Sequence, residues 1–357
     1  MVTSTFARQV GFVLGLLVVL VLAWRLHDVL VLTFGAVVLA TAIRAGARRL
    51  EQWPGLSPRQ AVVAVVVLVA LGLLVGGWLV GDPFTEQIGR LRERLPAALD
   101  AATDWLRQRP AGQALLQWWH SLRGEGIAWA PVLNAAGLTF GALGNAGLMV
   151  VLAVYLALDP RLYRQGLLRL VPMAWRTRVA SALEASGEGL QRWLLGQGVS
   201  MLFVGCSTAL GLALLGMPMA FSLGVIAGLM DFVPYFGPIA SGLVAVLFAF
   251  TEGPEKALYV AILAAVIQQV EGNVLMPLVQ RRAVELPPVL GLLSVVVFGL
   301  LFGVMGVIFA TPMMVVTMIL VQKLYVQQVL HDPMPATAEA SPASPPAVPR
   351  TDTAPPG

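Results

Sequence analysis

A break in an apolar stretch carries the residues best suited to bind an ion or a polar solute. An apolar run reaches Asp231, the chain continues as Phe-Val-Pro-Tyr-Phe-Gly-Pro, and a second apolar run follows. The prolines prevent a straight helix here, because proline lacks the amide donor and clashes with the preceding turn. Transport proteins use broken helices to direct helix ends and free carbonyls towards a substrate. The candidate residues of this break are Asp231, Pro234, Tyr235, Gly237 and Pro238.

Asp231 is the most enclosed acidic residue of the sequence. A carboxylate at membrane depth costs about 2.5–3.5 kcal/mol on insertion scales, and it is a candidate functional group for that reason. Two structural roles are the alternatives. The side chain could cap the helix that follows the break, or it could pair with an arginine elsewhere in the chain.

A second polar group lies at the end of a later apolar run. The segment Gln-Gln-Val-Glu-Gly-Asn-Val-Leu-Met-Pro occupies residues 268–277 and is followed by two arginines. We expect Gln268, Glu271 and Asn273 to form a second wall of the site, or a gate near the break. The alternative is a helix end at the membrane surface, with the arginine side chains extending into water.

Residues 286–322 form a third unusual segment, because they carry no charge over 37 residues. One span needs only about 20 residues, so the segment is predicted to fold about residues 302–306 into two half-length helices. Gly303 at this fold joins the candidate pathway. The Leu-Gly and Phe-Gly pairs resemble those of residues 223–237, which suggests an inverted pair of hairpins. A competing count makes each segment a full span, and the positive-inside rule favours the hairpins.

The overall composition indicates what kind of protein positions these residues. Of the 357 residues, 58% are apolar and 12% are charged, and the mean hydropathy is +0.81. Soluble domains carry about 25% charged residues, so this apolar excess cannot be buried in a water-soluble core. The composition therefore predicts an integral membrane protein and excludes a soluble enzyme, a nucleic-acid-binding protein and a disordered chain. The basic residues lie between apolar blocks, which is typical of a topology signal.

Hydropathy predicts an all-α polytopic membrane protein with about eight hydrophobic segments, two of them broken or re-entrant hairpins. The first two segments are expected to form a tight hairpin around residues 24–28. The segments occupy residues 9–24, 29–43, 60–81, 126–158, 193–230, 232–251, 257–270 and 286–322.

Four regions follow from this pattern. Residues 1–81 are expected to hold the first three spans, and residues 82–137 an extracytoplasmic amphipathic helical segment. Residues 138–332 are expected to form the transporter core, with a cytoplasmic helical segment at 159–195, and the Pro-rich tail at 333–357 is predicted to be disordered. The arginine-rich connections predict a multi-pass membrane protein with both termini in the cytoplasm.

Motifs for enzymatic, cofactor or metal chemistry are missing from the sequence. It contains no hydrolase, P-loop or dinucleotide-binding motif, so neither an enzymatic activity nor a cofactor is expected, and transport must run on gradients. The three histidines lie far apart and Cys206 is the only cysteine, which argues against a metal site or an internal disulfide. Glycines at 137, 141, 144 and 147 predict a helix-packing surface that makes a homo-oligomer an expectation.

Several motifs resemble those of the AI-2E family of bacterial transporters, the autoinducer-2 exporters that are also called PerM-like. Taken together they cover roughly the second half of the chain. The matching stretches are Leu-Gly-Gln at 195–197, Leu-Gly-Met-Pro at 215–218, the break at 231–238, the polar segment at 268–277, Pro288, Phe-Gly-Val-Met-Gly at 302–306 and Pro312.

The resemblance implies a multi-span inner-membrane protein that exports autoinducer-2 or another small solute. Some relatives are described as sodium/proton antiporters. The sequence departs from the family pattern at two positions: Pro287 stands where the family usually has a histidine, and Arg281 where it usually has a glycine. The missing histidine weakens the case for antiport if that residue carries protons in relatives.

Three functions therefore remain open. The first is a secondary transporter of a small polar solute, with Asp231 and the break as its site. The second is a sodium or lithium/proton antiporter that uses Asp231 or Glu271 as its carboxylate. The third is a non-transporting membrane scaffold with residues 159–195 as its docking face. The expected partners are a small solute, a coupling cation or proton, and the lipid bilayer, with no nucleic acid.

Overall fold

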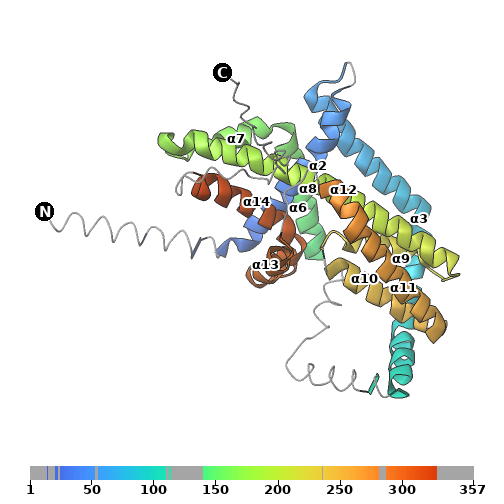
Figure 1. Cartoon of the computed structure of the whole chain (residues 1–357). Coiled ribbons are helices and arrows are strands. Elements are labelled where there is room, and N and C mark those ends of the chain that lie inside the picture. The colour runs from blue at the N-terminus through green and yellow to red at the C-terminus, as the bar shows by residue number, and fades with distance from the viewer. Residues whose placement is uncertain are drawn as a thin grey trace, which may run out of the picture.

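The computed structural model describes residues 14, 21–22, 25–52, 55–109, 112–113, 140–234, 236–280 and 287–327, and every regular element in this part of the chain is a helix (Figure 1). The predicted all-α class is therefore confirmed. Four of the described helices are long and apolar enough to cross a membrane, or five if one bent pair counts as a single span. The number of about eight hydrophobic segments stays a prediction, and the tail at 333–357 lies outside the described residues.

The first described helices pack on one another through small side chains. Helix α2 (His27–Leu50) contacts both α3 (Pro58–Arg107) and α6 (Phe140–Leu158). Small residues let helix backbones approach closely, which is how helices associate in membranes. The buried alanines at these contacts are Ala36, Ala40, Ala47, Ala61, Ala153 and Ala157.

The prediction of a tight hairpin around residues 24–28 is wrong, because the described residues there continue as a helix. The amide of Leu26 donates to the carbonyl of Leu22 at 2.9 Å, and the amide of Leu30 donates to the carbonyl of Leu26 at 2.9 Å. Both are helical bonds between residues four apart. Residues 24–28 contain neither proline nor glycine, so nothing in the local sequence forces the chain to turn.

Helix α3 is much longer than one span. It starts at a capping box, in which Ser57 and Gln60 bond to each other's backbone amides, and it runs for 50 residues. It passes the expected end of the third span at residue 81 without a break. The helix predicted at the start of residues 82–137 is thus present as far as Arg107, while its extracytoplasmic location stays a prediction.

Helix α7 (Pro160–Arg169) follows α6 after a sharp bend of 89°. At the bend, Arg59 of α3 forms an ion pair with Asp159 at 3.0 Å. Helix α8 (Met173–Leu214) then runs for 42 residues. Residues 159–195 are therefore helical apart from the short connections, while the cytoplasmic location of this segment stays a prediction.

Helix α9 (Ala220–Met230) turns back along α8 through glycine contacts. A Cβ atom on Gly224 would collide with Ala209, and one on Gly228 would collide with the carbonyl of Met201 and with Gly205. The turn at residues 215–219 has positive φ angles at Gly216 and Met219. The uncharged run at 193–230 is too long for one span, and this turn divides it.

The chain folds back again after Asp231. Helix α10 (Phe236–Phe250) starts so close to the end of α9 that a Cβ on Gly237 would collide with the carbonyl of Met230. In a straight helix these residues would lie about 10 Å apart along the axis. Helix α11 (Pro254–Val270), a π-helix (Glu271–Leu275) and α12 (Met276–Gln280) follow.

A second reversal lies within α13 (Pro288–Ile308), where Gly303 has φ 63° and ψ −145°. A Cβ on Gly306 would collide with the carbonyl of Phe298, eight residues earlier, which a straight helix would place about 12 Å away. The fold-back predicted at residues 302–306 is confirmed. Helix α14 (Ala310–Val321) and a second π-helix (Gln322–Val326) complete the described chain. Whether either hairpin is re-entrant stays a prediction.

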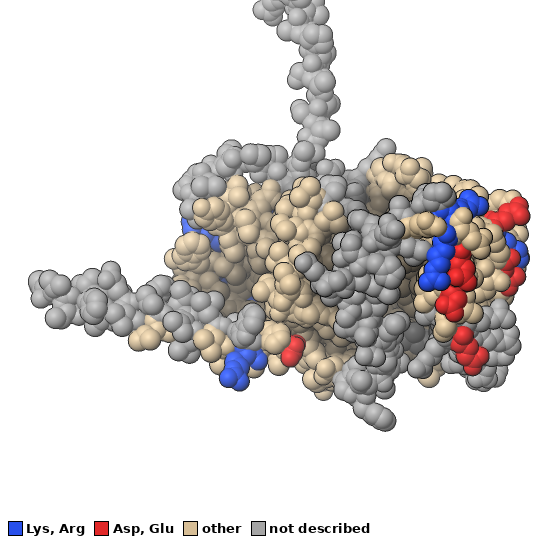
Figure 2. Space-filling view, turned by 90° about the horizontal axis from the view of Figure 1, so that it is seen from below, with Lys and Arg blue, Asp and Glu red and all other residues tan. Residues whose placement is uncertain are grey.

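The surface of the molecule suits a lipid environment. Figure 2 shows charged side chains towards the edges of one face, with an uncharged expanse between them where the surface is described. Large apolar side chains are widely exposed, including Leu202 at 70% and Leu300 at 82%. Exposed apolar surface on this scale is typical of a protein that contacts the hydrocarbon interior of a membrane.

Candidate functional site

A polar cluster lies buried between α8, the break after α9 and the end of α11. Four of its side chains keep 4% or less of their surface exposed: Gln197, Ser200, Asp231 and Glu271. Together with Gln268 we call these residues the carboxylate cluster. Gln197 and Ser200 stand three residues apart on α8, so they lie on one face of that helix.

Asp231 stands at the end of α9, at the break between α9 and α10. We call this the first break and the reversal within α13 the second break. Asp231 contacts Gln197 twice. The Gln197 side-chain amide donates to the Asp231 carbonyl at 2.6 Å and to its carboxylate at 3.3 Å. The glycine contacts between α8 and α9 allow this, because they hold the two backbones close together just before the break. The break also leaves backbone carbonyls without helical partners, and Gln197 satisfies one of them.

Glu271 is held from both sides. The Ser200 hydroxyl donates to one carboxylate oxygen at 2.5 Å, and the Gln268 amide donates to the other at 3.0 Å. Glu271 is the first residue of the π-helix that interrupts the span. Such single-turn π-helices occur frequently at functional sites.

Neither carboxylate has a basic partner among the residues that the structure describes. Asp231 and Glu271 form no ion pair there, and each is bonded only by neutral amide or hydroxyl groups. Burying an acidic group without a cation is expensive, which is why buried charges are usually paired or bind an ion. The cluster is thus suited to exchange a proton or a cation.

The two structural roles considered for Asp231 from the sequence, a helix cap and a pair with an arginine, are not observed in the described chain. Helix α10 begins five residues later, so Asp231 stands at the end of α9 rather than at the start of α10. Its carboxylate faces Gln197 rather than an arginine.

The other predicted site residues divide into those that join the cluster and those that do not. Gln268 and Glu271 join it. Asn273 is exposed and donates instead to Gln269 at 3.1 Å, so the expected second wall lacks it. Gly303 forms the second break and takes no part in the hydrogen bonds of the cluster. Tyr235 lies outside the described residues.

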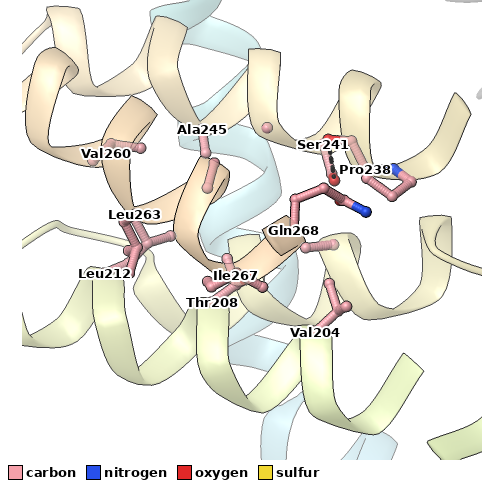
Figure 3. Close-up of a pocket in the computed structure, with 13 residues that line it drawn as sticks. Val204, Thr208, Leu212, Pro238, Ser241, Ala245, Val260, Leu263, Ile267 and Gln268 are labelled. Atoms are coloured by element: carbon pink, nitrogen blue, oxygen red, sulfur yellow. Dashed lines mark hydrogen bonds between the residues drawn. The ribbon is translucent and has the colours of Figure 1, made fainter. Parts of the chain in front are cut away.

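Pro234, Gly237 and Pro238 shape the first break. Pro234 accepts from the amide of Phe236 at 2.8 Å, and Gly237 provides the close approach to α9. Pro238 lines a cavity between α8, α9, α10 and α11 (Figure 3). These residues position the chain, and none of them supplies a charged group.

Gln268 belongs both to the wall of this cavity and to the carboxylate cluster. The wall of the cavity is mostly apolar, with the hydroxyls of Thr208 and Ser241 and the amide of Gln268 as polar groups (Figure 3). The volume of the cavity is about 40 Å³. A water molecule needs roughly 10–15 Å³ by this measure, so the cavity has room for about three waters. It is therefore wide enough for water or a small ion and too narrow for an organic solute.

The two breaks meet at a row of aromatic rings. Phe232, next to Asp231, contacts Trp193 of α8 with ring centroids 5.7 Å apart, and it contacts Phe309 at 6.5 Å. Phe309 lies between α13 and α14 and also contacts Phe34 of α2 at 6.3 Å. This row of four rings connects the first break to the second and to the first described helix.

Sequence reasoning missed Gln197 and Ser200 as site residues. Both are polar residues inside a long uncharged run, and their spacing of three places them on one helical face. That signal was available, but only the fold shows that the same face meets both Asp231 and Glu271.

Replacing Ser200 by alanine tests the cluster as a structural unit. The change leaves one Glu271 oxygen without its donor, so we expect Ser200→Ala to lower the free energy of unfolding by about 1–3 kcal/mol. Ser186→Ala is the matched control on the same helix, because the Ser186 hydroxyl only bonds to a helical carbonyl, that of Ala182. Thermal unfolding of the purified proteins measures both. Equal stability of the two variants would contradict the bond between Ser200 and Glu271.

Broken helices around buried carboxylates, in a molecule with wide apolar surfaces, are features of helical membrane proteins of the transporter class. The chain belongs to the AI-2E family of transporters, because the family profile, described as AI-2E family transporter, matches residues 12–325.

Relatives from several bacteria agree with this assignment. The chain is 27% identical to the candidate transport protein sll0060 of Synechocystis sp. over 74% of its length and 79% of that protein. It is 28% identical to the candidate permease PerM of Escherichia coli (strain K12), over 74% of this chain and 80% of PerM. It is 27% identical to the candidate transport protein YueF of Bacillus subtilis (strain 168) over 51% of this chain. The chain spans about half the length of YueF.

Proposed function

We propose that this protein is a secondary transporter of the bacterial inner membrane and that the carboxylate cluster is its coupling site. The observation that carries the proposal is the pair of buried carboxylates, Asp231 and Glu271, bonded only by neutral groups at a break in the helices. A proton or cation that binds there compensates the buried charge, and its release is coupled to a rearrangement of the chain around it. The arginine distribution places both termini in the cytoplasm in this proposal.

The family resemblance makes autoinducer-2, or a small polar solute like it, the first transported substrate to test. The cavity beside Gln268 is too narrow for such a solute in this conformation. The proposal therefore includes an opening movement of α9 and α10 relative to α8 and α11, with the connections at residues 215–219 and 251–253 as the hinges. Alternating movement of one hairpin around a fixed site is the usual plan of secondary transporters.

Sodium or lithium/proton antiport is the second candidate, and the pair of buried carboxylates without a basic partner in the described chain favours it. The two carboxylates could then bind a cation and a proton in turn, without any organic substrate.

One experiment separates the two candidates. Purified full-length protein is reconstituted into liposomes with an imposed pH gradient, and the decay of the gradient is followed after addition of sodium, lithium or potassium. Cation-dependent decay that is lost in Asp231→Asn supports antiport. No decay with any cation rules out antiport, and uptake of autoinducer-2 is then measured in the same liposomes. A protein that moves neither cations nor small solutes under any imposed gradient would contradict the proposal as a whole.

A further inference from the structure

The helix that follows the bend after α6 has an apolar face without a partner in the described chain. Four large side chains of this face are exposed, and at 3.6 residues per turn they fall within roughly 140° around one side of α7 and its end. We call them the α7 face. They are Leu162 at 66% exposed, Tyr163 at 40%, Leu167 at 57% and Leu170 at 83%.

Arginines lie at the borders of this face and on the opposite side of the helix. Arg161 and Arg169 are exposed and form no ion pair with a described residue. Arg164 points towards α8, where it pairs with Glu184 at 3.2 Å. Helix α8 therefore covers the side of α7 that bears Arg164, and the α7 face is left open on the other side.

The angle between α6 and α7 indicates which environment the α7 face contacts. Helix α6 is apolar along its length and exposes Val151 and Tyr155, as a lipid-facing span does. Helix α7 leaves the end of α6 at 89°, so it runs parallel to the membrane surface when α6 crosses the membrane (Figure 1). A short amphipathic helix in that position, with arginines beside its apolar side chains, is typical of an interfacial helix on anionic lipid.

The start of α8 continues the same surface. Met173 is 82% exposed, and Trp175 is 42% exposed with the Arg178 guanidinium 5.5 Å from its ring centre. Tryptophan and arginine together are enriched where a protein meets lipid headgroups.

We infer that α7 and the first turns of α8 form a binding surface for anionic phospholipid. The α7 face inserts among the acyl chains at the membrane boundary, and Arg161, Arg169 and Arg178 bind the phosphates of the headgroups. Charge complementarity favours lipid over a protein partner, because the exposed groups beside the apolar face are cationic and the lipid bilayer already surrounds α6.

Site-specific probes test where the α7 face lies. Cys206, the only cysteine, is replaced by serine. A single cysteine is then introduced into the full-length protein as Leu167→Cys, or as Gln165→Cys on the opposite side of α7, and labelled with an environment-sensitive fluorophore. In liposomes, quenchers attached to lipid acyl chains are expected to quench the probe at 167, and aqueous iodide the probe at 165. A probe at 167 that iodide quenches and lipid does not would overturn the inference and leave the face for a protein.

A second measurement tests the headgroup contacts. Energy transfer from the probe at 165 to a fluorescent phosphatidylglycerol is compared with transfer to a fluorescent phosphatidylcholine. We expect about twofold enrichment of the anionic lipid. The double variant Arg161→Gln/Arg169→Gln should lose this enrichment, whereas Arg107→Gln, an exposed arginine at the end of α3, should keep it. Equal enrichment in both variants would overturn the role of these arginines. Neither measurement depends on transport activity.

Discussion

Asp231→Asn is expected to abolish transport in a protein that still folds. Asparagine has the size of aspartate and can still accept from Gln197, so the contacts between α8 and the break remain. The variant removes only the group that binds a proton or cation. Losing a positioned ionisable group costs roughly 100-fold or more in rate in comparable proton-transfer sites. Transport by reconstituted liposomes, together with the yield of folded protein from size-exclusion chromatography, measures both effects.

Glu271→Gln and the double variant Asp231→Asn/Glu271→Gln show whether the two carboxylates act as one site. If they do, each single change removes nearly all activity and the double variant loses little more, because residues that act as a unit are strongly non-additive. Asp104→Asn is the control, since Asp104 is an exposed carboxylate beside Arg107 on α3. Wild-type transport by Asp231→Asn would remove Asp231 from the site. Wild-type transport by Glu271→Gln would restrict the site to the break.

The breaks of the chain could be predicted because their cause is local. Prolines or glycines stand between apolar runs at both reversals, and the runs are too long for one span, so both reversals were visible in the sequence. Proline alone is not a sufficient signal, because α3 continues through Pro83 and Pro96. The role of Gly237 needed the fold, since it depends on the carbonyl of Met230 standing against it. The length of α3 could not be predicted from hydropathy, because charged residues end a membrane span without ending a helix.

The candidate site was predicted in part. Charge inside an apolar run identified Asp231 and Glu271, but their partners Gln197 and Ser200 come from α8, more than 30 residues away in sequence from Asp231. No local pattern reports such a contact. Asn273 does not join the hydrogen bonds of the cluster, because it stands two residues after Glu271, and positions two apart do not face the same side of a helix.

Gly237→Ala is expected to destabilise the fold directly at the first break. The added methyl group would overlap the carbonyl of Met230, which belongs to the backbone and cannot move without shifting the end of α9. Overpacking of this kind typically lowers the free energy of unfolding by about 1–3 kcal/mol, which is a large part of the marginal stability of a domain. Asp231 stands next to Met230, so the same shift would also pull the carboxylate away from Gln197.

The second reversal should respond in the same way, since both depend on one close approach between a glycine and a carbonyl. In Gly306→Ala the methyl group would overlap the carbonyl of Phe298. Gly187→Ala is the control: Gly187 is exposed on α8 with nothing within 4 Å of the added methyl, and alanine favours the helix by about 1 kcal/mol. We expect lower apparent melting temperatures for the first two variants and an unchanged or higher one for the third. If Gly237→Ala melts like wild type, the chain does not fold back at this residue. The site would then have to form without the close contact between α9 and α10.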